Sequence, residues 1–365
     1  MLKTGIANLP LHGGCCPRWL FPRMKKLAGA ISEVLIYEYG SEEFLKRLAD
    51  PYWLQSFGCV IAYDWHSSGL TTTTLAALKE SLNKQNLGIK ITGGKGTTSR
   101  KTPKEIEEFG EKLNLSTNKI ERLKYSSKII AKVDNSLVQD GYQLYTHSLI
   151  FLEDGRKYIV IQQGLNYLNR YARRYHWMSD NINSFVIEPH SAICGDKKEE
   201  NVLDMTSRYS LETQKVCVDL VKDNQKHLER HIKTPIQKTL VNFEHFTMPS
   251  HHFIVDMHKR NLETLQKAHE IQPSNYEEFV AIEGVGPKTI RSLALISELV
   301  YGTKASWRDP VKYSFAHGGK DGYPRPVNKE LMESNAEILR NAIKDAKLGG
   351  KEKLFAIKRL SNFYN

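Results

Sequence analysis

The sequence has few cysteines and no long apolar run, and these two absences exclude several classes of protein. Five cysteines are scattered over 365 residues and none forms a Cys-x-x-Cys pair. Neither a disulfide framework nor four-thiolate zinc or iron–sulfur ligation is therefore expected. No run of about 18 apolar residues is present to span a bilayer, and residues 1–23 lack the uninterrupted apolar core of a signal peptide. We expect a cytoplasmic protein with reduced thiols.

Positive charge is what the sequence has in excess. Lysine and arginine number 52 against 41 aspartates and glutamates, which gives a formal net charge of +11. The hydrophobic content of 40% is ordinary for a folded chain, and the length allows about two domains. A basic surplus indicates a polyanionic partner such as nucleic acid, although a solvated basic surface gives the same count.

The pattern of apolar residues predicts an α+β fold. Residues 143–152 and 157–163 are rich in β-forming side chains and enclose Asp154-Gly155, which predicts a β-hairpin. Glycines at 93, 94 and 96 predict a loop. Beyond about residue 195 the chain reads as successive helices. We predict a mixed α/β domain over residues 1–200 and an all-α domain over residues 201–365.

Residues 276–301 carry the most specific local signal, a helix, a tight turn and a second helix. Gly284 and Gly286 flank Val285, and Pro287 follows at the first position of the new helix. The free N–H groups of the turn and of the first helical turn, up to Thr289, can bind an anion. The segment resembles the helix-hairpin-helix motif of DNA-repair proteins, which predicts phosphate contacts there; an ordinary turn between helices is the alternative.

Two residues suggest chemistry as well as binding. Lys288 opens the second helix and Asp309 follows 21 residues later, after Gly302. This order resembles the helix-hairpin-helix DNA glycosylases, in which the matching lysine attacks the sugar C1′ and the aspartate supports the reaction. The resemblance implies catalytic roles for Lys288 and Asp309. Alternatively, Lys288 contacts a phosphate, and Asp309 caps a helix that continues at Pro310.

Nearly the whole chain also resembles the family catalogued as domain of unknown function 763. Members are associated with removing oxidised pyrimidines such as 5-hydroxyuracil from DNA in thermophilic archaea and bacteria. The resemblance implies a cytoplasmic, nucleoid-associated glycosylase with AP lyase activity, with no metal or other cofactor. It is carried by residues 9–14 (LPLHGG), 50–58 (DPYWLQSFG), 64–69 (DWHSSG), 93–96 (GGKG), 99–103 (SRKTP), 172–177 (ARRYHW) and 307–319 (WRDPVKYSFAHGG).

Two further segments are candidates for contact with DNA. If residues 166–177 are helical, one face of the helix could contact phosphates and stack unpaired bases, and it carries Tyr167, Arg170, Tyr171 and Arg174. A helix with buried aromatics and solvated arginines is the alternative. Residues 90–132 contain 11 basic and five acidic residues. Lys95 and Arg100 in this segment could grip phosphates, although the spacing of a P-loop is absent and a solvated surface is the alternative.

These observations predict a base-excision-repair enzyme whose partner is damaged double-stranded DNA. Lys288 would displace an oxidised or deaminated pyrimidine and form a Schiff base that permits strand cleavage. Two alternatives remain open. A metal-dependent nuclease could use Asp64 and His66, or the hairpin could serve a non-catalytic DNA-binding protein. No membrane partner is expected, and the sequence does not identify protein partners.

Overall fold

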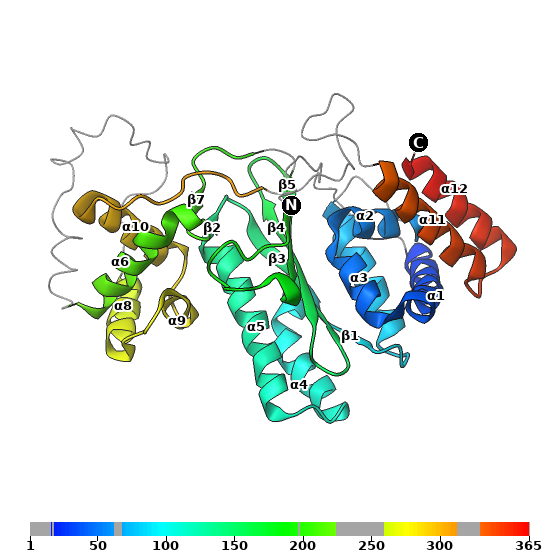
Figure 1. Ribbon diagram of the computed structural model, residues 1–365, viewed down its shortest axis with the longest axis horizontal. Helices are drawn as coiled ribbons and strands as arrows, with labels where there is room; N and C mark the ends of the chain where they lie inside the picture. Colours follow the sequence, from blue (N-terminus) through cyan, green and yellow to red (C-terminus); the bar gives the residue numbers. More distant parts are fainter. Residues whose placement is uncertain are drawn as a thin grey trace.

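The computed structural model describes residue 16 and residues 18–61, 68–195, 198–223, 259–311 and 329–364. Over these residues the protein has a mixed α+β fold of 11 α-helices and a five-stranded antiparallel sheet (Figure 1). A short two-stranded sheet pairs β2 (Val138–Gln139) with β7 (Leu203–Asp204). No helix in the described part is both long and apolar enough to cross a membrane.

The central sheet has the strand order β1-β3-β4-β5-β6. The predicted hairpin is confirmed: β3 and β4 pair in antiparallel fashion, and the N–H of Gly155 donates to the Leu152 carbonyl in the turn. The predicted loop at residues 93–96 is wrong in part, because Gly93 and Gly94 belong to the edge strand β1. The strands are β1 (Ile89–Lys95), β3 (Gln143–Leu152), β4 (Tyr158–Asn166), β5 (Tyr171–Met178) and β6 (Ala192–Cys194).

Helices cover both faces of this sheet, so successive strand residues enter two different cores (Figure 1). Ile159 and Ile161 join the core on the face covered by helices from the two ends of the chain. Tyr158 and Val160 point to the other face. The helices that share this core are α1 (Leu20–Ala49), α2 (Pro51–Val60), α3 (Ser68–Leu82), α11 (Lys329–Asp345) and α12 (Gly350–Tyr364). Of these, α1 and α3 contact the strands, and α11 and α12 pack on α1 and α2.

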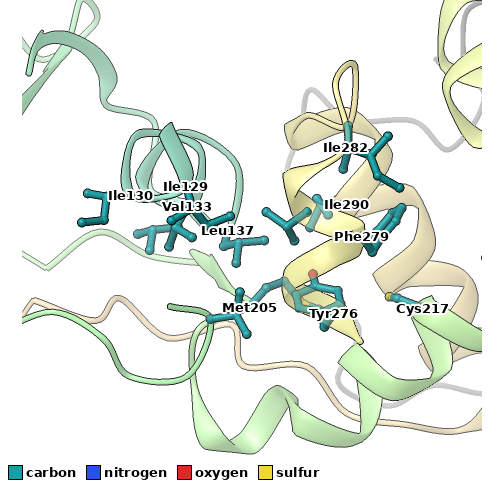
Figure 2. Close-up of a cluster of buried hydrophobic side chains, with 14 of the residues drawn as sticks. Ile129, Ile130, Val133, Leu137, Met205, Cys217, Tyr276, Phe279, Ile282 and Ile290 are labelled. Carbon is teal, nitrogen blue, oxygen red and sulfur yellow. The ribbon is translucent and has the colours of Figure 1, made fainter. Parts of the chain in front are cut away.

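The opposite face meets the remaining helices. On that side α5 lies along the sheet (Figure 1), and side chains of the helices that follow the sheet in sequence meet those of α5 (Figure 2). Ile129 and Val133 of α5 share this core with Phe279 and Ile290, which come from the two helices of the predicted helix-hairpin-helix. The helices here are α4 (Thr102–Lys112), α5 (Thr117–Ser136), α6 (Leu211–Lys222), α8 (Lys259–Ile271), α9 (Tyr276–Ala281) and α10 (Pro287–Tyr301).

Residues 166–177 are not a helix. They form the exposed turn between β4 and β5 and then β5 itself, which pairs with β4 and β6. The residues of β5 alternate between the two cores, so Tyr175 and Arg174 point to opposite faces of the sheet. Tyr167 and Arg170, which a helix would have aligned with Arg174, lie in the turn instead.

The predicted division at residue 200 stays a prediction, but the packing crosses it in two places. The core around α5 contains side chains from both sides, such as Val160 and Leu293. On the other face, α11 and α12 pack with α1 and α2, although they belong to the predicted second part (Figure 1). Lys26 of α1 and Glu352 of α12 form an ion pair at 2.9 Å across this contact.

The shared core around α5 yields a stability prediction. Ile290 is fully buried on α10, so Ile290→Ala should lower the free energy of unfolding by about 2–5 kcal/mol, because it leaves a cavity between α10 and α5. Val300 on the same helix is 46% exposed, so Val300→Ala should change this free energy by less than about 0.5 kcal/mol. Urea denaturation followed by circular dichroism measures both, and equal effects would contradict the packing described.

Candidate DNA-binding and catalytic site

The predicted helix, tight turn and second helix are present, and the local sequence explains their geometry. Asn275 caps α9 by accepting from the N–H of Glu278 at 2.9 Å, and the Glu278 carboxylate accepts from the N–H of Ser274 at 2.8 Å. Gly284 has φ +93°, a conformation that suits glycine. Gly286 is the N-cap of α10 and has no side chain to satisfy the free N–H groups of the first helical turn.

The side chains of the predicted contact residues at the hairpin are not available for binding, and the N–H of Val285 is used within the turn, where it donates to the Ile282 carbonyl at 3.2 Å. Val285 is 2% exposed and Thr289 is 1% exposed, because both side chains point into the protein. Lys288 is exposed at the first turn of α10, and Glu283 is exposed just before the turn. The hairpin thus presents N–H groups and one lysine amine to the solvent beside one carboxylate.

A half-buried lysine of α5 forms a hydrogen bond to the backbone of the hairpin. Lys132 donates from Nζ to the Ile282 carbonyl, which lies at the end of α9. Burial lowers the pKa of Lys132 to about 8, against the raising effect of Glu283. Gln139 of β2 also contacts the hairpin, because its Nε2 donates to the Pro287 carbonyl at 2.9 Å. The turn therefore has a second lysine amine close to it besides that of Lys288, and the pKa of this second amine is lowered by burial.

Asp309 is buried in an ion pair and is not exposed beside Lys288. Its two carboxylate oxygens accept from the guanidinium of Arg173 at 2.9 and 2.8 Å, and one accepts from the N–H of Glu199 at 2.6 Å. The side chain is 1% exposed. Residues 309–311 are not helical, so Asp309 is not the start of a helix at Pro310. The structure does not bring the carboxylate of Asp309 to the amine of Lys288.

The Arg173 guanidinium joins three parts of the chain in one buried charge cluster. It pairs with Asp309 and also donates to Asp140 at 3.0 Å, and it lies 4.5 Å from the ring centroid of Tyr142. Tyr175 donates from its hydroxyl to Asp140 at 2.6 Å. Burial raises the pKa of Asp140 to about 6, although Arg173 and the hydrogen bonds oppose this rise. The cluster therefore holds β5, the turn after β2 and the segment after α10 together.

Lys95 and Arg100 are exposed at the end of the sheet where β1 leads into a 3₁₀ helix, Gly96–Lys101. Lys95 Nζ lies 5.9 Å from the ring centroid of Tyr145. The preceding Gly93 is closely enclosed: an added Cβ would lie 2.2 Å from the His147 carbonyl oxygen. Its N–H donates to Glu105 at 2.7 Å, so this amide is already used and does not offer itself to a phosphate.

A cavity of about 930 Å³ opens beside this glycine segment. Its walls come from α3, β1 and the ends of β3 and β4, and they include Thr72, Lys95 and Tyr145. Lys79 in the same wall is held by Glu105 at 2.7 Å. Tyr167 of the β4–β5 turn also lines it. The glycine segment and this turn, separate in sequence, therefore meet at one cavity.

The two predicted arginines differ in access. Arg170 is exposed at the β4–β5 turn with φ +60°, where it can reach a ligand. Arg174 is fully buried, and its guanidinium donates to Gln55 of α2 at 2.8 Å. Arg174 therefore stabilises the contact between β5 and α2, and a direct contact of its side chain with DNA does not fit this structure.

The residues of the alternative nuclease site, Asp64 and His66, lie outside the described residues. Within the described part, no group of three or more His, Cys, Asp or Glu side chains could hold a metal ion. The sequence pattern does not mark Arg173, Asp140 or Lys132 as site residues. The one signal in the sequence is the Arg-Arg pair between Tyr171 and Tyr175. If this segment is a central strand covered on both faces, both arginine side chains must be buried.

Comparison with known proteins identifies one family. A family model described as "Protein of unknown function (DUF763)" matches residues 5–327. No curated protein matches the chain, and no solved structure matches it.

The buried charge cluster predicts a large effect at Arg173. Arg173→Met should lower the free energy of unfolding at pH 7 by about 3–5 kcal/mol, because two buried carboxylates lose their cation. Asp140→Asn should cost less, because Arg173 keeps its pairing with Asp309. Urea denaturation of the two variants and the wild type gives these values.

The same cluster sets the sign of a pH effect. The folded pKa of Asp140, about 6, lies above its ordinary value, so the folded state favours the protonated form and stability falls as pH rises through 6. Without the cation of Arg173 the pKa of Asp140 rises further. The difference in free energy of unfolding between Arg173→Met and the wild type should therefore become smaller as pH falls from 7 to 5. A deficit that widens over that range would contradict the interpretation.

Proposed function

Because this chain belongs to the DUF763 family, whose function its description leaves open, its activity has to be inferred from its own residues, and we propose that it is a DNA glycosylase with AP lyase activity. The observation that carries the proposal is the exposed Lys288 amine next to the backbone N–H groups of Gly284 and Gly286. The lesion class, an oxidised or deaminated pyrimidine such as 5-hydroxyuracil, comes from the family resemblance.

In this proposal the hairpin holds the DNA backbone. The N–H groups at Gly284, Gly286 and the first turn of α10 donate to a phosphate oxygen, and the positive end of the helix dipole adds to the attraction. Such contacts position the DNA without reading its bases. Arg170, Lys95 and Arg100 are exposed and contribute further phosphate contacts, whose strength falls with salt.

Lys288 supplies the chemistry. The damaged nucleotide is turned out of the duplex. The unprotonated Nζ attacks C1′, and the bond to the base breaks as the base leaves and takes up a proton. The sugar ring opens to a Schiff base between Nζ and C1′, and loss of a C2′ proton then expels the 3′ phosphate. Asp309 stabilises the protein through Arg173 in this scheme, and proton transfer falls to other groups or to water.

Borohydride trapping tests the nucleophile. The full-length protein, incubated with a duplex containing 5-hydroxyuracil or an abasic site, should form a covalent complex on reduction, and Lys288→Ala should abolish it. Lys304 is an exposed lysine just beyond α10, so Lys304→Ala is the matched control and should trap normally. Because burial lowers the pKa of Lys132, Lys132→Ala belongs in the same series.

Each result of that series has one meaning. A complex that persists in Lys288→Ala refutes the assignment of the nucleophile, and its loss in Lys132→Ala alone would move the role to Lys132. Strand cleavage that EDTA abolishes and that is indifferent to both lysines would support the nuclease alternative. DNA binding without any complex or cleavage would support a non-catalytic role.

The hairpin anchor has a separate test in binding. Gly284→Ala places a side chain at φ +93° and a Cβ 2.7 Å from Thr264 Oγ1, so the turn must distort. If the bound geometry of the turn carries a strain of about 1–2 kcal/mol, the affinity for DNA should fall roughly tenfold. Gly350→Ala is the control, because its added Cβ meets nothing within 4 Å. Fluorescence anisotropy with labelled duplex measures both, and unchanged binding by Gly284→Ala would contradict the anchor.

A further inference from the structure

A chain of buried polar side chains connects α5 to the sheet and ends in a serine–histidine pair. Ser127 Oγ of α5 lies 2.8 Å from His147 Nε2 of β3. The other ring nitrogen, Nδ1, lies 2.7 Å from Gln162 Oε1 of β4. Gln162 Nε2 donates in turn to Asp134, which also accepts from Trp177 Nε1 at 2.9 Å.

The partners along this chain decide which atoms carry protons. Gln162 must turn its amide nitrogen to the Asp134 carboxylate, so its Oε1 faces His147 and accepts from Nδ1–H. Nε2 of His147 is then the acceptor, and the Ser127 hydroxyl donates to it. Burial lowers the pKa of His147, which favours the neutral imidazole that this arrangement requires.

The pair does not lie in a sealed core. Ser127, His147 and Gln162 line a cavity of about 240 Å³ that opens between α5, β3 and the 3₁₀ helix after β1. Ala131 and Leu144 give it apolar walls. Arg100 and Lys128, both exposed, line the same cavity and supply positive charge. A nucleophile, a neutral base and an oriented support for that base thus meet at a small space that attracts anions.

We propose that Ser127 and His147 form a nucleophile–base pair that cleaves small carboxylic esters bearing a negatively charged group. The apolar walls receive a short acyl chain, and Arg100 and Lys128 hold the negative group. Gln162, supported by Asp134, is a positioning residue that keeps the ring of His147 in the tautomer whose Nε2 accepts a proton. This activity does not involve Lys288, although it shares Arg100 with the proposed DNA contacts.

The reaction divides into two balanced halves. Ser127 Oγ bonds to the ester carbonyl carbon while its proton passes to His147 Nε2, and the bond to the alcohol breaks as the alcohol takes that proton. Water then attacks the acyl-serine and gives a proton to His147. The Ser127 oxygen leaves, recovers the proton, and the carboxylic acid is released.

Covalent labelling tests the nucleophile directly. An alkyl fluorophosphonate should modify the full-length protein once, by an Oγ–phosphorus bond with loss of fluoride, and peptide mapping should place the label on Ser127. Ser127→Ala should not be labelled. Ser126→Ala is the matched control, because Ser126 is the adjacent buried serine and does not line the cavity, so it should label at the wild-type rate.

Turnover tests the substrate class. The wild type should hydrolyse the 4-nitrophenyl monoester of succinic acid, and Ser127→Ala should lower kcat/KM at least about 100-fold. Lys128→Ala should raise KM for this ester and leave KM for neutral 4-nitrophenyl butyrate unchanged. Gln162→Glu, which can still accept from Nδ1, should retain more activity than Gln162→Leu. Matching thermal unfolding of Ser127→Ala and Ser126→Ala shows that both fold.

A folded wild type that remains unlabelled at Ser127, or that hydrolyses neither ester faster than the Ser127→Ala variant, overturns the proposal. Neither result bears on borohydride trapping at Lys288, so the two functions fail or stand separately.

Discussion

The structure depends on a sheet whose two faces are both covered by helices. An antiparallel sheet commonly leaves one face to water, but here residues of either parity on β3, β4 and β5 are buried. A polar side chain on these strands therefore cannot turn to solvent and must find its partners inside the protein. Arg173 finds Asp140 and Asp309, Arg174 finds Gln55, and Gln162 finds Asp134 and His147.

This constraint decides what each candidate residue can do. Asp309 forms a buried ion pair with Arg173 of β5, and this pair fixes the segment after α10 against β5. Lys288 stays outside because the hairpin turns its apolar side, Val285 and Ile290, toward α5 and presents the start of α10 to solvent. The same requirement for internal partners explains the series of hydrogen bonds from Asp134 through Gln162 and His147 to Ser127. The serine and the histidine at its end line a cavity.

Predictions from the sequence succeeded where the signal was local. The β3–β4 hairpin follows from two β-rich runs around Asp154-Gly155, and the tight turn between α9 and α10 follows from Gly284, Gly286 and Pro287. They failed for β1, where Gly93 belongs to a strand and is required by the close approach of the His147 backbone. They also failed for residues 166–177, since arginines beside aromatics match an amphipathic helix as well as a strand buried on both faces.

The sequence by itself determined the mixed composition of the fold, the turn of the hairpin and the position of Lys288 at a helix start, because each depends on backbone preferences of neighbouring residues. Only the tertiary structure decided that Asp309 pairs with Arg173, that Arg174 is inaccessible and that Ser127 meets His147. These side chains are 136, 119 and 20 positions away from their partners. Long-range pairing is set by which faces the strands and helices bury against one another, and that choice is made by the packing of the whole sheet between its two helical layers.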